Sequence, residues 1–195
     1  VTIRTTVSKP LTYGEKMKPS LLAETIEYNL KANIPTMIWG PPGCGKSQIV
    51  RQVSDKLYAE SHGLTLDKNG KLHDTNGLYT GERPYLRDIR ASLLDPTDIR
   101  GIPYIDTVNK TANWAIPSFL PRSGSGILFF DEINLAAQSV QSSLYQIVLD
   151  NHAGEHPIPL EWRHYLAAGN NSADRCGVIR MSKALENRFM HCDLD

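Results

Sequence analysis

The sequence predicts an α/β fold in which helices cover both faces of a parallel sheet. Short apolar runs alternate with segments of helical periodicity, and glycine-rich or polar turns follow the runs. The runs are continuous rather than alternating, as expected of strands that are buried on both faces. The chain has 195 residues, of which 41% are apolar, so it is long enough for one such domain.

The first expected elements are a helix, a strand and a second helix. Residues 1–19 show little periodicity and are interpreted as a lead-in segment. Ser20 is a plausible N-cap for a helix that runs to about Lys31, in which apolar residues recur every four positions. An apolar run at 35–39 predicts a buried strand that enters a glycine loop, and helical spacing resumes from Lys46.

Two hairpins and a short strand are expected next. Residues 61–84 are polar and contain an Asn-Gly turn between short apolar pairs, which is typical of a small hairpin. Residues 85–94 contain a second strand. A helix that begins at Asp95 is stopped by Gly101, and a second hairpin follows at 102–116.

The last third of the chain predicts three more strands and two helices. The most apolar run, 126–130, ends in two acidic residues, and helical spacing follows at 135–149. A buried strand is expected at 165–168. A short helix at 182–187 then leads into a final strand at 189–194.

Charge and cysteine content exclude several classes of protein. Lys+Arg and Asp+Glu both number 21, and this balance disfavours binding of nucleic acid or an anionic membrane by bulk charge. Cys44, Cys176 and Cys192 are widely spaced and odd in number, which favours a reducing, cytoplasmic location over a disulfide framework. No apolar run approaches the ~18–20 residues that span a bilayer. Because the chain starts at Val1, we expect a piece of a longer protein.

Residues 40–47 fit the phosphate-loop pattern G-x-x-x-x-G-K-[ST], with a strand before them and a helix after them. Glycines allow the backbone to approach a triphosphate, and the helix N-terminus favours an anion. Lys46 would reach the β- and γ-phosphates, and Ser47 would ligate Mg²⁺. The alternative is a glycine-rich turn with a solvated lysine. The candidate nucleotide-binding residues are Gly40, Pro41, Pro42, Gly43, Cys44, Gly45, Lys46, Ser47, Gln48 and Asp131.

Two adjacent acids, Asp131 and Glu132, end the most apolar strand. Two carboxylates at the mouth of a buried strand are costly unless a cation balances them. Asp131 would hold Mg²⁺ through water, and Glu132 would polarise the attacking water as general base. The alternative is that one of them only caps the following helix.

Asn170 and Arg188 complete the candidate catalytic set. Asn170 ends the next apolar strand, where an amide could hold the lytic water and sense the γ-phosphate; the alternative is a turn residue. Arg188 could act as an arginine finger supplied in trans, or form a surface ion pair. Arg175 and Arg180 are weaker candidates for the same role.

These motifs occur in the order found in AAA+ ATPases, and the chain resembles that family. The phosphate loop matches Walker A, the apolar strand with its acidic pair matches Walker B, Gly169-Asn170 matches sensor 1, and Asn187-Arg188-Phe189 matches the arginine finger. Within the family, the chain is most similar to the branch of MoxR-type ATPases, midasin and dynein. The stretches that carry this similarity are Leu93–Gly101, Asp131–Val140 and the hairpin at 102–116.

The resemblance implies that residues 20–195 form a P-loop NTPase three-layer α/β/α sandwich with a five-stranded sheet in the order 5-1-4-3-2. It implies binding of ATP and Mg²⁺ and assembly into a ring, as a rule a hexamer, with Arg188 acting in trans. It also implies a protein client or a von Willebrand A-type partner. The chain stops before the family's helical lid, the polar insert 61–84 is longer than expected, and Gly169-Asn170-Asn171 departs from the commoner Gln-Asn-Pro.

Three functions remain open at this point. The first is an ATP-hydrolysing motor that remodels a protein. The second is a nucleotide-gated assembly module with little turnover. The third is a nucleic-acid remodeller whose hairpin, with Lys110 at its tip and Trp114 near its base, enters a ring pore.

Overall fold

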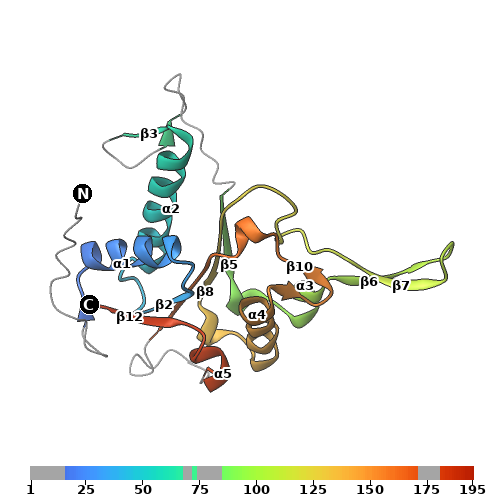
Figure 1. The fold of residues 1–195 in the computed structure, drawn as a ribbon. Coiled ribbons are helices and arrows are strands. Elements are labelled where there is room, and N and C mark those ends of the chain that lie inside the picture. Colours follow the sequence, from blue (N-terminus) through green and yellow to red (C-terminus); the bar gives the residue numbers. More distant parts are fainter. Residues whose placement is uncertain (1–15, 68–71, 74–84, 171–180) are drawn as a thin grey trace.

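A sheet of six strands forms the centre of the protein (Figure 1). The computed structural model describes residues 16–67, 72–73, 85–170 and 181–195. All neighbouring strands of this sheet run parallel. In spatial order they are β1 (Lys16–Met17), β12 (Met190–Leu194), β2 (Thr36–Trp39), β11 (Tyr165–Gly169), β8 (Ile127–Asp131) and β5 (Leu86–Arg90).

The order of the five expected strands is 5-1-4-3-2, as the resemblance implies, but the sheet has six strands rather than five. The sixth, β1, pairs with the outer edge of β12 through Lys16 and Met17. A strand of two residues is too short to give any period in the sequence, and it lies in the segment that we interpreted as a lead-in.

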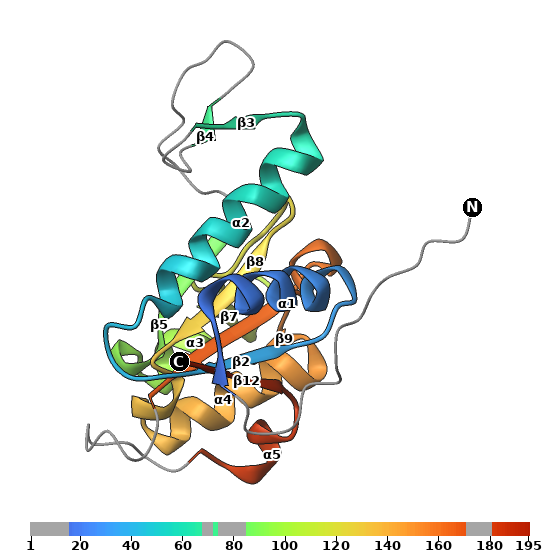
Figure 2. The ribbon, with the colours of Figure 1, turned by 90° about the vertical axis from the view of Figure 1, so that its left-hand side faces the viewer.

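Helices cover both faces of the sheet, as Figure 2 shows. Helices α1 (Pro19–Lys31) and α2 (Lys46–His62) pack on one face, and α4 (Gln138–Asp150) packs on the other. Strand β8 is buried throughout and contributes side chains to the apolar clusters on both faces of the sheet. Ile127 and Phe129 belong to the apolar cluster with α1 and α2, whereas Leu128 and Phe130 belong to the cluster with α4. This two-sided burial explains the continuous apolar runs.

Two expected helix starts are corrected by the structure. Lys18, rather than Ser20, is the N-cap of α1, because Pro19 occupies the first helical turn, where its fixed φ fits and its missing N–H costs nothing. The helix expected over 135–149 begins only at Gln138. Residues Ile133–Leu135 instead form a 3₁₀ helix, η2, and the extended Ala136 separates it from α4.

Several shorter elements follow strand β5 and helix α4. The 3₁₀ helix η1 (Ala91–Leu93) leads to α3 (Pro96–Arg100), whose start is fixed by a capping box between Asp95 and Asp98. The remaining elements are β9 (His152–Ala153), β10 (His156–Pro157), the 3₁₀ helix η3 (Leu160–Trp162) and α5 (Lys183–Glu186), which Ser182 caps. The β9–β10 hairpin was not predicted.

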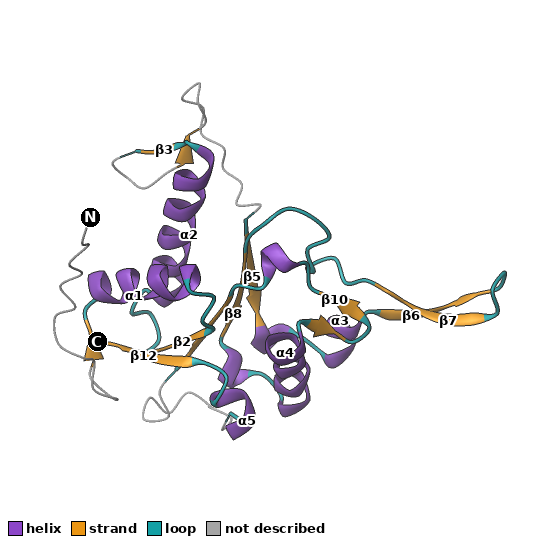
Figure 3. Ribbon diagram, in the orientation of Figure 1, coloured by secondary structure: helices purple, strands orange, loops and turns teal. Residues whose placement is uncertain are grey.

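Both expected hairpins form. Strands β3 (Thr65–Leu66) and β4 (Leu72–His73) pair antiparallel, while the Asn69-Gly70 turn lies outside the described residues. Strands β6 (Ile102–Asp106) and β7 (Thr111–Ala115) form a longer hairpin that projects well beyond the rest of the protein (Figure 3).

The base of the projecting hairpin requires a glycine. Gly101 has φ +91°, and a Cβ atom there would lie 2.0 Å from the carbonyl oxygen of Ala115. The guanidinium of Arg100 lies over the ring of Trp114, 5.7 Å from its centroid. Four large apolar side chains on the hairpin are exposed: Ile102, Tyr104, Ile105 and Val108.

Candidate functional site

The carboxyl ends of three neighbouring strands meet at one edge of the sheet. Gly169 of β11 pairs with Trp39 of β2, and Ala167 pairs with Phe130 of β8. The residues that follow these strands therefore lie together. Ligands of open α/β sheets bind at this edge.

The phosphate loop leaves β2 at this edge and enters α2. Gly43 and Gly45 have φ values of +78° and +90°, which L-residues with side chains rarely adopt. Gly45 is the N-cap of α2, so unpaired backbone N–H groups of the first turn point out of the helix. A Cβ atom at Gly40 would lie 2.9 Å from Cys44 Sγ, so the turn is also closely packed.

Lys46 is buried, and its ammonium has three oxygen partners. It donates to the carbonyl oxygens of Gly40 at 2.7 Å and Pro41 at 2.9 Å. It also donates to Oδ1 of Asn170 at 3.1 Å. The two predicted site residues Lys46 and Asn170 are thus in direct contact, although 124 positions separate them in the sequence.

Ser47 and Asp131 also meet at this edge. Ser47 Oγ donates a 2.6 Å hydrogen bond to Asp131 Oδ2. A hydroxyl oxygen and a carboxylate oxygen side by side fit Mg²⁺, which binds oxygen ligands and usually takes only one or two carboxylates from the protein. In the described part of the chain, no group of three or more His, Cys, Asp or Glu side chains could hold a metal ion. Ser47 and Asp131 stay the candidate Mg²⁺ ligands, on the contact between their oxygens.

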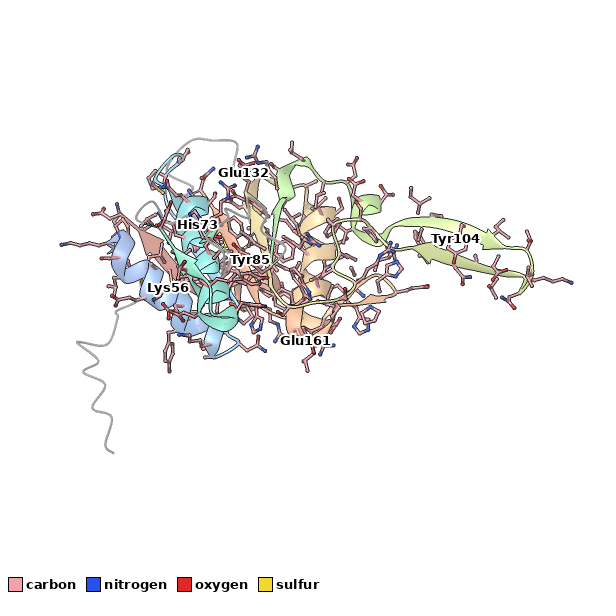
Figure 4. All side chains as sticks on the ribbon, turned by 90° about the horizontal axis from the view of Figure 1, so that it is seen from above. Lys56, His73, Tyr85, Tyr104, Glu132 and Glu161 are labelled. Carbon is pink, nitrogen blue, oxygen red and sulfur yellow. The ribbon has the colours of Figure 1, made fainter. Side chains whose placement is uncertain are left out.

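Glu132 adopts a left-handed backbone conformation, with φ 55° and ψ 35°. Such a conformation costs a non-glycine residue about 1–3 kcal/mol and is enriched at functional sites. Its N–H donates to Asp131 Oδ1 at 2.9 Å. Its carboxylate accepts a hydrogen bond from Ser92 Oγ and lies 4.0 Å from Arg90 Nε. Figure 4 shows Glu132 near the surface, in accord with its 36% exposed side chain.

Asn134 is a site residue that sequence reasoning missed. Its Nδ2 donates to the carbonyl oxygen of Asn170 at 2.7 Å, and its Oδ1 accepts from the N–H of Asn170 at 3.1 Å. The side chain is almost fully buried. A Cβ atom at Gly169 would lie 2.8 Å from Asn134 Oδ1, so the glycine makes room for this contact. Asn134 thus fixes the backbone of Asn170.

Ser92 was also missed as a neighbour of Glu132. It is a small polar residue in η1, directly after the second strand, and nothing in its sequence context marks it. The contact depends on β5 and β8 being neighbours in register, with Arg90 opposite Asp131. Only a three-dimensional pairing reveals it.

Arg188 is not brought into this cluster within one chain. It precedes β12, whose first residue, Met190, pairs with Thr36 at the start of β2, the end away from the phosphate loop. Its side chain is exposed and has no ion pair with any of the described residues. Arg175 and Arg180 lie outside the described residues.

Known proteins resemble this chain in their fold, and not detectably in their sequence. No protein-family model and no curated protein matches the sequence. A candidate ATPase from Cytophaga hutchinsonii matches 90% of this chain with a TM-score of 0.52 and 15% identity, over 46% of its own length. NtrX from Brucella abortus in complex with ATP matches 96% with a TM-score of 0.54 and 17% identity, over 37% of its length.

NtrX in complex with ADP gives a TM-score of 0.51 at 17% identity and covers 90% of this chain and 35% of NtrX. At such identities the likeness shows the fold, and it confirms the predicted α/β class. The chain spans less than half the length of each of these proteins. No helix in the described parts of the chain is long and apolar enough to cross a membrane.

Proposed function

We propose that this chain is the ATP-binding and ATP-hydrolysing domain of a AAA+ ATPase. The observation that carries the proposal is the convergence of Lys46, Ser47, Asp131 and Asn170 at the carboxyl edge of the sheet, through hydrogen bonds of 2.6–3.1 Å. The likeness of the fold to NtrX, whose solved structures include complexes with ATP and ADP, supports the nucleotide as ligand.

Each residue has a distinct role in this proposal. The N–H groups at the start of α2 bind the phosphates, assisted by the helix dipole, and Lys46 binds the β- and γ-phosphates. Ser47 and Asp131 hold Mg²⁺, which neutralises charge on the phosphates. Glu132 accepts a proton from the attacking water, and Asn170 orients that water.

Binding requires Lys46 to change partners. Its ammonium bonds to Gly40 O, Pro41 O and Asn170 Oδ1, and phosphate oxygens must replace at least some of these acceptors. When Lys46 releases Asn170 Oδ1, that amide oxygen becomes free to accept a hydrogen bond from the attacking water. Phosphate binding and water orientation are therefore linked through one side chain.

We further propose that the chain works in a ring, with Arg188 supplied to the neighbouring subunit. Arg188 is exposed and lies at the opposite end of the sheet from Lys46 of its own chain, which supports action in trans rather than in cis. A hexamer is the ring size that the AAA+ resemblance implies.

A protein client, or a von Willebrand A-type partner, is the favoured target of such a ring. The projecting hairpin presents exposed apolar side chains, with Tyr104 visible on it in Figure 4. Exposed apolar patches mark protein interaction sites. For the nucleic-acid alternative, the hairpin offers Lys110 as its only lysine, and Trp114 is partly covered by Arg100.

Calorimetric titration with ATP and Mg²⁺ tests the proposal. Lys46→Ala should abolish measurable binding, because it removes the cation that faces the phosphates. Lys56→Ala is the matched control: it removes a lysine of the same helix that pairs with Glu27 on the surface. Equal affinity of wild type and Lys46→Ala would refute the phosphate site.

Turnover distinguishes the motor from the assembly module. Measurable phosphate release by the wild-type chain, lost in Glu132→Gln with ATP still bound, supports the motor. If wild type binds ATP and releases no phosphate in its assembled form, the chain is a nucleotide-gated assembly module.

A further inference from the structure

Two aromatic side chains connect the phosphate loop to the segment that carries Arg188. Trp39 is the last residue of β2 and directly precedes Gly40. Its indole Nε1–H donates a 2.7 Å hydrogen bond to Nδ1 of His191, which lies on β12. The two rings are stacked, with an interplanar angle of 8° and centroids 6.0 Å apart.

The hydrogen bonds fix the tautomer of His191. Indole N–H can only donate, so Nδ1 of His191 accepts and carries no proton. The proton of the neutral ring is therefore on Nε2, which donates to the carbonyl oxygen of Glu186 at 2.8 Å. The imidazole uses both nitrogens and bridges β2 to the end of α5.

The Glu186 carbonyl belongs to the turn that holds Arg188. It also accepts from the N–H of Phe189 at 3.3 Å, and the N–H of Arg188 donates to Leu185 O at 3.1 Å. His191 therefore contacts the turn in which the Arg188 backbone is fixed. Pairing of β12 with β2 is made by the backbone and does not need either ring.

We propose that His191 is a positioning residue: together with Trp39 it ties the Arg188 turn to the phosphate loop of its own chain, and so sets how Arg188 is presented to the ATP of the neighbouring chain. The proposal rests on the proposed function, because it needs Arg188 to act in trans. It adds a connection between the two ends of β2 through the side chains of Trp39 and His191.

Mixed assemblies separate the two roles of a subunit. Glu132→Gln chains keep Arg188 but cannot hydrolyse, and Arg188→Ala chains keep the hydrolytic site but lack the arginine. Mixed in equal amounts, they should recover phosphate release, because the first supplies Arg188 to the second. Failure of this mixture to recover activity would refute arginine supply in trans, and with it the proposed function of Arg188.

In the next experiment, His191→Phe is combined with either Glu132→Gln or Arg188→Ala, so that only one chain of the mixture carries it. Added to the Glu132→Gln chain, which donates the arginine, it should lower the recovered kcat about tenfold, since misplacement by about 1 Å can cost up to 100-fold. Added to the Arg188→Ala chain, which donates the hydrolytic site, it should leave kcat within about twofold and leave KM for ATP unchanged.

Trp39→Phe supplies the second measurement, because it keeps one aromatic ring but removes the N–H donor together with the second ring of the indole. It should show the same dependence on placement, and the double variant should lose no more than His191→Phe alone, since both break one connection. Three outcomes would each overturn the proposal. They are an equal loss of kcat in both placements, no loss of kcat in either placement, and a loss only when the substitution is in the chain that donates the hydrolytic site.

Discussion

Removing the Asn134 side chain should weaken the fold and slow turnover together. In Asn134→Ala, the N–H and the C=O of Asn170 both lose their side-chain partner in a buried environment. A buried polar group left without a partner costs about 1–3 kcal/mol. Two such groups predict a loss of about 3 kcal/mol, which is less than the stability of an ordinary domain of about 5–15 kcal/mol.

The functional consequence follows from the position of Asn170. Without Asn134, the backbone of Asn170 is free to shift, and its amide no longer lies at a fixed distance from Lys46. We expect kcat to fall between about tenfold and 100-fold. Affinity for ATP should change much less, because the N–H groups of residues 43–48 remain in place.

Urea unfolding and phosphate release measure the two effects. The matched control is Tyr165→Phe, which removes a 2.8 Å hydrogen bond to Asn151 at the opposite end of the same strand. It should cost about 1 kcal/mol and leave kcat unchanged. If Asn134→Ala loses stability but keeps its kcat, Asn134 has no part in positioning Asn170; if its stability is unchanged, the two hydrogen bonds contribute nothing.

The remaining predictions concern three other positions. Glu132→Gln should bind ATP with unchanged affinity and lose phosphate release, and equal turnover would refute Glu132 as general base. Gly101→Ala should cost about 2 kcal/mol or more in urea unfolding, because φ is +91° and the new Cβ meets Ala115 O, while ATP affinity is kept. Burial lowers the pKa of His164. As the pH falls, His164 therefore becomes protonated in the unfolded chain at a higher pH than in the folded chain. The free energy of unfolding should decrease from about pH 6.5 downward. His164→Leu should reduce the dependence of the unfolding free energy on pH, whereas the control His62→Gln should keep it. An unchanged dependence in His164→Leu would contradict the assignment of this effect to His164.

The sequence predicted the elements of the sheet well because their signals are local. Strand β8 is a continuous apolar run, and the turn at 108–111 between two extended segments predicted the projecting hairpin. The strand order came from the AAA+ resemblance rather than from periodicity. Strand β1 was missed because pairing of two residues with β12 leaves no local pattern.

The site was predictable only in part, for the same reason. Lys46, Ser47 and Asp131 lie within motifs whose spacing is visible in the chain. Asn134 and Ser92 act through partners 36 and 40 positions away, and their roles exist only once β8, β11 and β5 are neighbours. Side-chain contacts between distant strands have no sequence period.

The three acceptors around Lys46 have a consequence for ligand selectivity. An ammonium has three protons, and here Gly40 O, Pro41 O and Asn170 Oδ1 satisfy all of them. We expect a ligand that offers several oxygens at once to replace these partners more readily than a ligand that offers one. Chloride or a single carboxylate provides too few, whereas a polyphosphate provides enough. We therefore expect the loop to discriminate among anions by the number of acceptors that they carry, whatever base or sugar is attached.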